Sequence, residues 1–116
     1  MPLNGAGMNL AANALIAGLA YAQIHDGDPG ASGTDNIASS TRVAINWTSP
    51  TDGDFGLEDA LEFTGITANG DATHVSFWSA ATSGTYYGYE ELTGDTTANS
   101  SGEFIITDLD ADGTAT

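Results

Sequence analysis

His25 and His74 are the side chains whose ordinary pKa lies near neutral pH, so they are the first candidates for acid–base chemistry or metal binding. Each lies close in sequence to aspartates. A hydrolytic site also needs an activated nucleophile, and the sequence has no cysteine, no lysine and no Gly-x-Ser-x-Gly segment. We therefore expect no enzymatic activity, and we interpret His25 as a residue that orients the Pro-Gly turn following it at 29–30.

Three aspartates near the C-terminus, Asp108, Asp110 and Asp112, are the candidate ligands for a metal ion. With Gly113 they form the pattern D-x-D-x-D-G, which begins a calcium loop because alternate carboxylates converge on the cation and glycine permits a sharp turn. The bidentate Glu expected at the twelfth position of such a loop would be residue 119, whereas the sequence has 116 residues, and acidic residues are common enough for a chance match. We therefore predict no cofactor and a solvated acidic tail, with Ca²⁺ or another cation as the alternative. An acidic cluster at 52–59 is open to the same two interpretations.

Four aromatic residues, Trp78, Tyr86, Tyr87 and Tyr89, form the third candidate site. Aromatic rings on a sheet face can bury the apolar side of a sugar ring, while nearby Asp and Asn bind its hydroxyls. Tyrosine and tryptophan are also enriched where subunits meet. We predict that these four residues contribute to an oligomer or partner contact, and carbohydrate binding is the alternative.

An apolar segment at 8–22 precedes all of these side chains and predicts an N-terminal helix. Its apolar stripe recurs at helical spacing and is expected to dock on a sheet. The stripe consists of Leu10, Ala14, Ala17 and Tyr21. Asn4 is the expected N-cap, and Gly18 marks the last turn. The segment is too short to span a bilayer and lacks the Lys or Arg of a secretion signal, so we expect neither role.

Beyond residue 20 the pattern changes to alternation at every second residue, which predicts short strands between turns. The predicted strands are 21–25, 42–48, 60–64, 74–79, 85–92 and 103–109. Glycine marks turns at 26–30 and 83–84. In this pattern Trp47 and Phe77 point into the core, whereas Trp78 falls on the opposite face with no place in its own core.

These elements predict a single domain over 1–116 that is mainly β. The expected architecture is an antiparallel β-sandwich, jelly-roll-like, with one short N-terminal helix. The helix lies within 1–20, the sandwich within 21–109 and the acidic tail within 110–116.

The charge balance excludes several classes of partner. Sixteen acidic residues face one basic residue, Arg42, which gives a formal net charge of -15. Binding to nucleic acid or to an anionic membrane needs a basic patch, and one arginine cannot form it. Such a charge also repels itself in dilute buffer, whereas molar salt shortens the Debye length to about 3 Å. The composition is similar to that of proteins from halophilic archaea.

Four segments, in this order and spacing, carry a resemblance to a protein family. They are the Ala-rich helix at 9–19, the strand and Asp-Pro-Gly turn at 24–30, the Arg-to-Trp strand at 42–47, and the hairpin at 78–88, which reads Trp-Ser-Ala-Ala-Thr-Ser-Gly-Thr-Tyr-Tyr-Gly. Together they resemble small tail-fibre or minor virion proteins of tailed phages. The acidity departs from the bacterial-phage pattern and fits a haloarchaeal tailed virus.

The resemblance implies a structural protein of the virion, made in the cytoplasm of a halophilic host. Its expected place is a surface appendage of the tail, in a fibre or baseplate, or of the capsid, as decoration or turret, where it aids host attachment. The expected partners are other virion proteins, further copies of the chain in a trimer or pentamer, and a host surface glycan. The alternative is a carbohydrate-binding or adhesin module that recognises a glycosylated cell surface.

Overall fold

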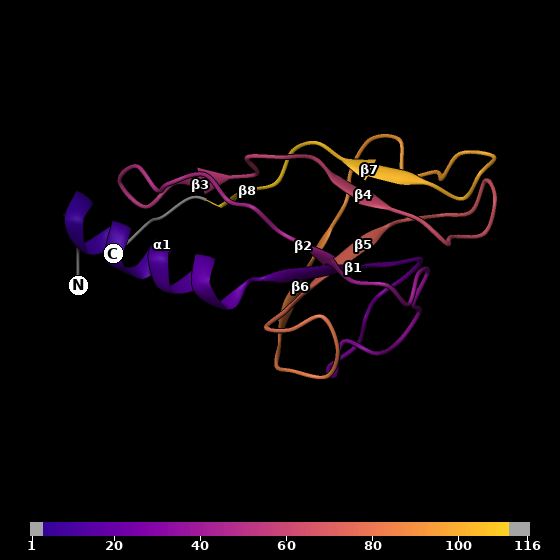
Figure 1. Ribbon diagram of the computed structural model, residues 1–116, viewed down its shortest axis with the longest axis horizontal. Coiled ribbons are helices and arrows are strands. Elements are labelled where there is room, and N and C mark those ends of the chain that lie inside the picture. Colours follow the sequence, from indigo (N-terminus) through magenta and orange to yellow (C-terminus); the bar gives the residue numbers. More distant parts are fainter. Residues whose placement is uncertain (1–3, 112–116) are drawn as a thin grey trace.

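The computed structural model describes residues 4–111, which form one helix followed by short antiparallel strands (Figure 1). In chain order the elements are α1 (Gly5–Gly18), β1 (Tyr21–His25), β2 (Val43–Ala44), β3 (Phe55–Gly56), β4 (Leu61–Phe63), β5 (His74–Trp78), β6 (Tyr86–Glu91), β7 (Phe104–Ile106) and β8 (Asp110–Ala111). The predicted class, mainly antiparallel β with one short N-terminal helix, is confirmed.

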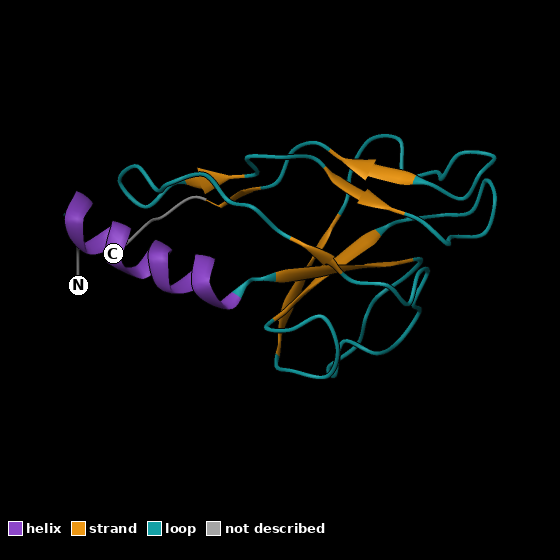
Figure 2. Cartoon of the chain, in the orientation of Figure 1, coloured by secondary structure: helices purple, strands orange, loops and turns teal. Residues whose placement is uncertain are grey.

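Helix α1 begins after the predicted N-cap, and Gly18 lies in its last turn, as predicted. The Asn4 side chain accepts a hydrogen bond from the Gly7 backbone N–H at 2.8 Å, and the helix ends at Gly18. Within residues 4–111, no helix has the length and apolarity needed to cross a membrane. The expected docking of the stripe on a sheet is wrong, because Leu10 is 75% exposed and Ala12, on the other side of the helix, is buried. Figure 2 shows α1 extending away from the four-stranded sheet, with β3 and β8 above it in this view.

The largest sheet has the strand order β2-β1-β5-β6, with β6 as one outer strand. Strands β1 and β5 pair along their full lengths, which places His25 opposite His74. Strand β6 returns through a hairpin in which Ser83 and Gly84 both have positive φ, 55° and 76°, as the turn prediction requires.

Strands β4 and β7 form a second layer that packs over this sheet and encloses the core. Leu61 and Phe63 point inward and Glu62 outward, as the alternation predicts. The core cluster is Ala22, Ile24, Ile45, Leu61, Phe63, Ile66, Ala72, Val75, Ala98, Ile106 and Leu109. Trp47 and Phe77 pack against it, so their predicted inward orientation is confirmed. Figure 1 shows β4 and β7 on one side of the crossing strands, which gives the molecule its sandwich-like layers.

Two regions differ from the predicted strands. The segment 42–48 is not one continuous strand, because its backbone leaves β1 after Ile45 and pairs next with the segment 56–58. It still keeps its alternation, with Ile45 buried and Asn46 exposed. At the C-terminal end, Asp110–Ala111 pairs with β3, so the backbone of these two residues is a strand rather than a solvated tail. Residues 112–116 lie outside the described part of the chain.

Candidate functional site: the aromatic surface of strand β6

The exposed aromatic side chains of β6 border a groove beside the end of α1. Tyr87 and Tyr89 are 54% and 46% exposed, and they alternate with Gly88 along the strand. The groove has a volume of about 340 Å³ and a mostly apolar lining. Its lining residues are Ala14, Leu15, Gly18, Leu19, Phe77, Tyr87, Gly88 and Tyr89. An open apolar groove with phenol hydroxyls can take either a side chain of another protein or a small flat ligand.

Trp78, predicted to belong to this exposed surface, is instead 5% exposed. Its indole Nε1 donates a hydrogen bond to the Ser76 hydroxyl at 2.8 Å, and its ring lies 5.2 Å from the ring of Tyr86 between centroids. The prediction that Trp78 has no place in its own fold is therefore wrong. The polar segment 26–41 covers this second face of the sheet, as the contacts of Gln23 and His25 with its backbone show.

Tyr86 also lies on the covered face, where it holds the covering segment. Gly33 has a φ of 72°, and a Cβ atom at this position would lie 2.5 Å from a ring carbon of Tyr86. Burial raises the pKa of the Tyr86 hydroxyl above its ordinary value. Of the four aromatic residues predicted as a contact surface, the structure thus leaves Tyr87 and Tyr89 exposed, and the contact itself stays a prediction.

Arg42, the one basic residue of the sequence, closes the hairpin around Trp78. Its guanidinium carbon lies 3.7 Å from the centroid of the Trp78 ring, which is a stacked cation–π contact. Nη1 donates hydrogen bonds to the carbonyl oxygens of Ala80 and Ser83, at 3.0 and 2.7 Å. Burial lowers the pKa of Arg42 slightly from its ordinary value, with no effect on its charge at neutral pH. The guanidinium of Arg42 therefore stabilises the fold through its contacts with Trp78 and the two carbonyl oxygens.

His25 is fully buried beneath the same covering segment and makes hydrogen bonds through both ring nitrogens. Nδ1 lies 2.8 Å from the Asp35 carbonyl oxygen, so this nitrogen must carry the proton. Nε2 then accepts from the Ser76 hydroxyl at 2.7 Å, and that hydroxyl accepts from Trp78. With a neutral imidazole, each ring nitrogen of His25 therefore has a hydrogen-bond partner. His25 thus fixes the loop after β1 and offers no free nitrogen to a substrate.

This arrangement predicts a loss of stability in mild acid. Burial lowers the pKa of His25 below 6.5, so near pH 6 the unfolded chain binds a proton that the folded chain rejects. The stability from neutral His25 is fully present above pH 6.5 and is lost as pH falls towards the folded pKa. Between pH 7 and 5.5 we expect the free energy of unfolding, measured with urea, to fall by at most about 1.3 kcal/mol.

A matched pair of variants separates the two histidines. His25→Gln should remove most of this pH dependence, whereas His74→Gln, altering the half-buried histidine whose Nδ1 contacts the Thr73 hydroxyl, should keep it. The range stays above the ordinary pKa of carboxylates, so their protonation contributes little. If the free energy of unfolding fell equally with pH in the parent and in His25→Gln, the pH dependence could not be assigned to His25.

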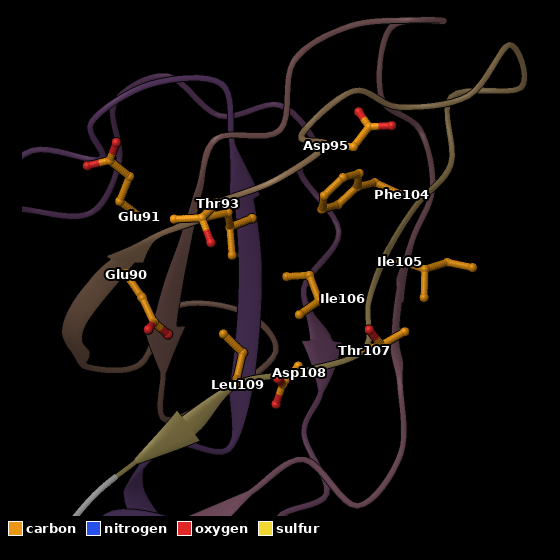
Figure 3. A pocket seen from close by; sticks show the side chains of 11 residues that line it. Glu90, Glu91, Thr93, Asp95, Phe104, Ile105, Ile106, Thr107, Asp108 and Leu109 are labelled. Atoms are coloured by element: carbon orange, nitrogen blue, oxygen red, sulfur yellow. The ribbon is translucent and has the colours of Figure 1, made fainter.

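A second groove, which the sequence did not predict, lies between the end of β6 and β7. Its volume is about 380 Å³, and it is lined by residues 90–93, 95 and 104–109. Figure 3 shows Glu90 and Glu91 on one side and Ile105 on the other, with Ile106 between them. These side chains come from two segments that residues 96–103 separate, and neither segment carries a motif that marks a groove.

The predicted metal ligands are only partly described by the structure. Asp108 lines the second groove, the side chain of Asp110 is not described, and Asp112 lies outside residues 4–111. Among the described residues, no group of three or more His, Asp or Glu side chains is arranged to hold a metal ion. The calcium alternative therefore stays a prediction.

Comparison with known families decides the class of protein. A family model described as "Podophage GP4 fiber I protein gp80" matches residues 11–113, which is most of the chain. The chain belongs to this podophage fibre family. No curated protein and no solved structure matches it. The resemblance to tail-fibre proteins of tailed phages is thereby confirmed.

Family membership makes the chain a structural fibre protein of a tailed virus, located in the virion. A fibre protein works by contacts with other proteins of the particle. Tyr87 and Tyr89, exposed beside Leu15 of α1, are of the residue type that is enriched at contacts between proteins.

Proposed function

We propose that this fibre protein is a non-enzymatic surface component of the tail of a haloarchaeal virus, present in several copies and contributing to host attachment. The family match over 11–113 carries the proposal. It favours a fibre over a capsid decoration, because the family description names a fibre protein.

The chemistry of the described residues supports a structural role. The buried histidine, His25, uses both ring nitrogens to hold a loop, and the arginine is occupied by Trp78 and two carbonyl oxygens. Two of the side chains suited to catalysis by residue type, His25 and Arg42, are thus used to hold the fold together. The charge of -15 without lysine supports a host with molar internal salt.

Labelling of virus particles tests the location. Antibodies raised against the purified chain should bind at the tail fibres in electron micrographs and should lower the rate of adsorption to host cells. Particles lacking tails provide the control, because they should lose the label. Label on the capsid shell, or no label on intact particles, would contradict the proposal.

Carbohydrate binding is the second candidate, and the open groove beside Tyr87 and Tyr89 is the observation that favours it. Host surface glycans titrated into the protein in molar KCl should show saturable binding if the groove is a sugar site. Tyr87→Ala should then abolish the signal, while Ile105→Ala, which alters an exposed side chain on β7, should not. If the parent bound no glycan, carbohydrate binding would be contradicted, and a contact with another protein would remain as the role of the surface around Tyr87 and Tyr89.

A further inference from the structure

Helix α1 is apolar on nearly every side, yet the described fold covers little of it. Its 14 residues contain no charged side chain, and Ala12 is its one buried residue. Leu10 and Leu15 are 75% and 50% exposed. A helix that is apolar all round is normally buried, so the exposed side of this helix lacks a packing partner in the single chain.

The exposed side of α1 carries a regular stripe of Leu10, Ala14 and Ala17. All three are exposed, and their spacing of four and then three residues is that of a seam between two packed helices. The opposite side is already held by the segment 51–54, where the Gly53 backbone N–H donates to the Asn9 side chain at 2.8 Å. The fold thus fixes α1 in place with this stripe turned outward.

Charge indicates what covers the stripe. Residues 1–25 contain no Asp, Glu, Lys or Arg, so all sixteen acidic residues follow them in the sequence. Asp52 lies beside α1, but on the side away from the stripe, so two chains of charge -15 meet with less repulsion through the stripe than through an acidic surface. The small side chains of Ala14 and Ala17 also allow two helix backbones to approach closely.

The shape of the molecule supports the same contact. The described chain measures 46 × 25 × 21 Å, and α1 occupies one end of its long axis (Figure 1). Copies joined through the stripe can direct the four-stranded sheet and its acidic covering segments away from one another. We propose that the stripe of Leu10, Ala14 and Ala17 packs against the same stripe of further copies, forming a helix bundle that joins the fibre subunits; the need for several copies rests on the proposed function.

Leu10→Glu tests the contact without touching the interior of the fold. In molar KCl, light scattering after size-exclusion chromatography should show an oligomer for the parent. The variant should dissociate at least about tenfold more readily, because a charge replaces a buried leucine in the seam. Ile105→Glu, at a side chain that is 53% exposed on β7, should assemble like the parent. A monomeric parent, or Leu10→Glu assembling like the parent, would overturn the proposal.

A cysteine placed in the stripe gives a second, direct test. The sequence has no cysteine, so one introduced thiol can form a disulfide only with another copy. Ala14 lies mid-stripe, so Ala14→Cys approaches its own copy in either parallel or antiparallel helices, and mild oxidation should give a covalent dimer. Ala31→Cys, in the exposed loop, should remain uncrosslinked. Equal crosslinking of both variants, or none at Ala14, would overturn the contact, whereas failure of the proposed function would appear separately as missing label on the fibres.

Discussion

Trp78→Ala is expected to lower the free energy of unfolding by about 3 to 5 kcal/mol, the usual cost of truncating a buried large aromatic side chain. The ring is 5% exposed, and its loss removes the stacking surface of Arg42 and the donor to Ser76. Denaturant unfolding in molar KCl measures the effect. Assembly should weaken only as far as the fold does, because the ring faces the covering segment 26–41.

The exposed aromatic residue of the same sheet provides the control for this prediction. Tyr87→Ala should change the free energy of unfolding by about 0.5 kcal/mol or less, as is usual for a surface side chain away from caps and strain. If Trp78→Ala melted like the parent while its assembly was lost, the ring would belong to a subunit contact and not to the interior.

A double-mutant cycle isolates the contact between Trp78 and Arg42. Arg42→Ala alone removes the stacked cation together with its bonds to Ala80 and Ser83. Combined with Trp78→Ala, the two losses should fall short of additivity by about 0.5 to 2 kcal/mol, the range of a partly desolvated cation–π pair. Additive losses would mean that the two side chains stabilise the hairpin independently.

Structure could be predicted from the sequence most reliably where neighbouring residues alone determine the backbone conformation or the direction of a side chain. Asn4 caps the helix because its side chain satisfies a backbone N–H that the first turn leaves unpaired. Leu61 and Phe63 face the core because a strand turns alternate residues to one side. Ser83 and Gly84 adopt the positive φ that a tight turn demands. Each of these features depends on residues close together in the chain.

Features that depend on distant partners could not be predicted in the same way. Alternation placed Trp78 opposite the core, but only the fold shows that Arg42 and the segment 26–41 cover it. Periodicity likewise found the stripe of α1 without indicating that it faces outward. A pattern of apolar residues shows that one face of a helix or strand must be buried. Which segment buries that face depends on how distant parts of the chain are arranged.

The remaining large effect expected is the loss of stability at low salt. A net charge of -15 is screened over about 3 Å in molar salt but over about 10 Å at 0.1 M, where neighbouring carboxylates repel one another. A repulsion of a few kcal/mol over this size of chain corresponds to a fall in melting temperature on the order of 10 °C. Circular dichroism melts across a KCl series from molar to 0.1 M measure it.

Salt can stabilise the fold in two ways, by screening repulsion between carboxylates and by strengthening apolar burial. A variant with fewer charges separates these two effects. The triple variant Glu58→Gln, Glu62→Gln and Glu91→Gln alters exposed side chains and reduces the formal charge from -15 to -12. If repulsion is the cause, the variant should lose less stability at 0.1 M than the parent, while both melt alike in molar salt. An equal salt dependence of both proteins would assign the effect to apolar burial, because the substitutions leave the core unchanged. A parent unaffected by salt would contradict adaptation of the chain to a halophilic host.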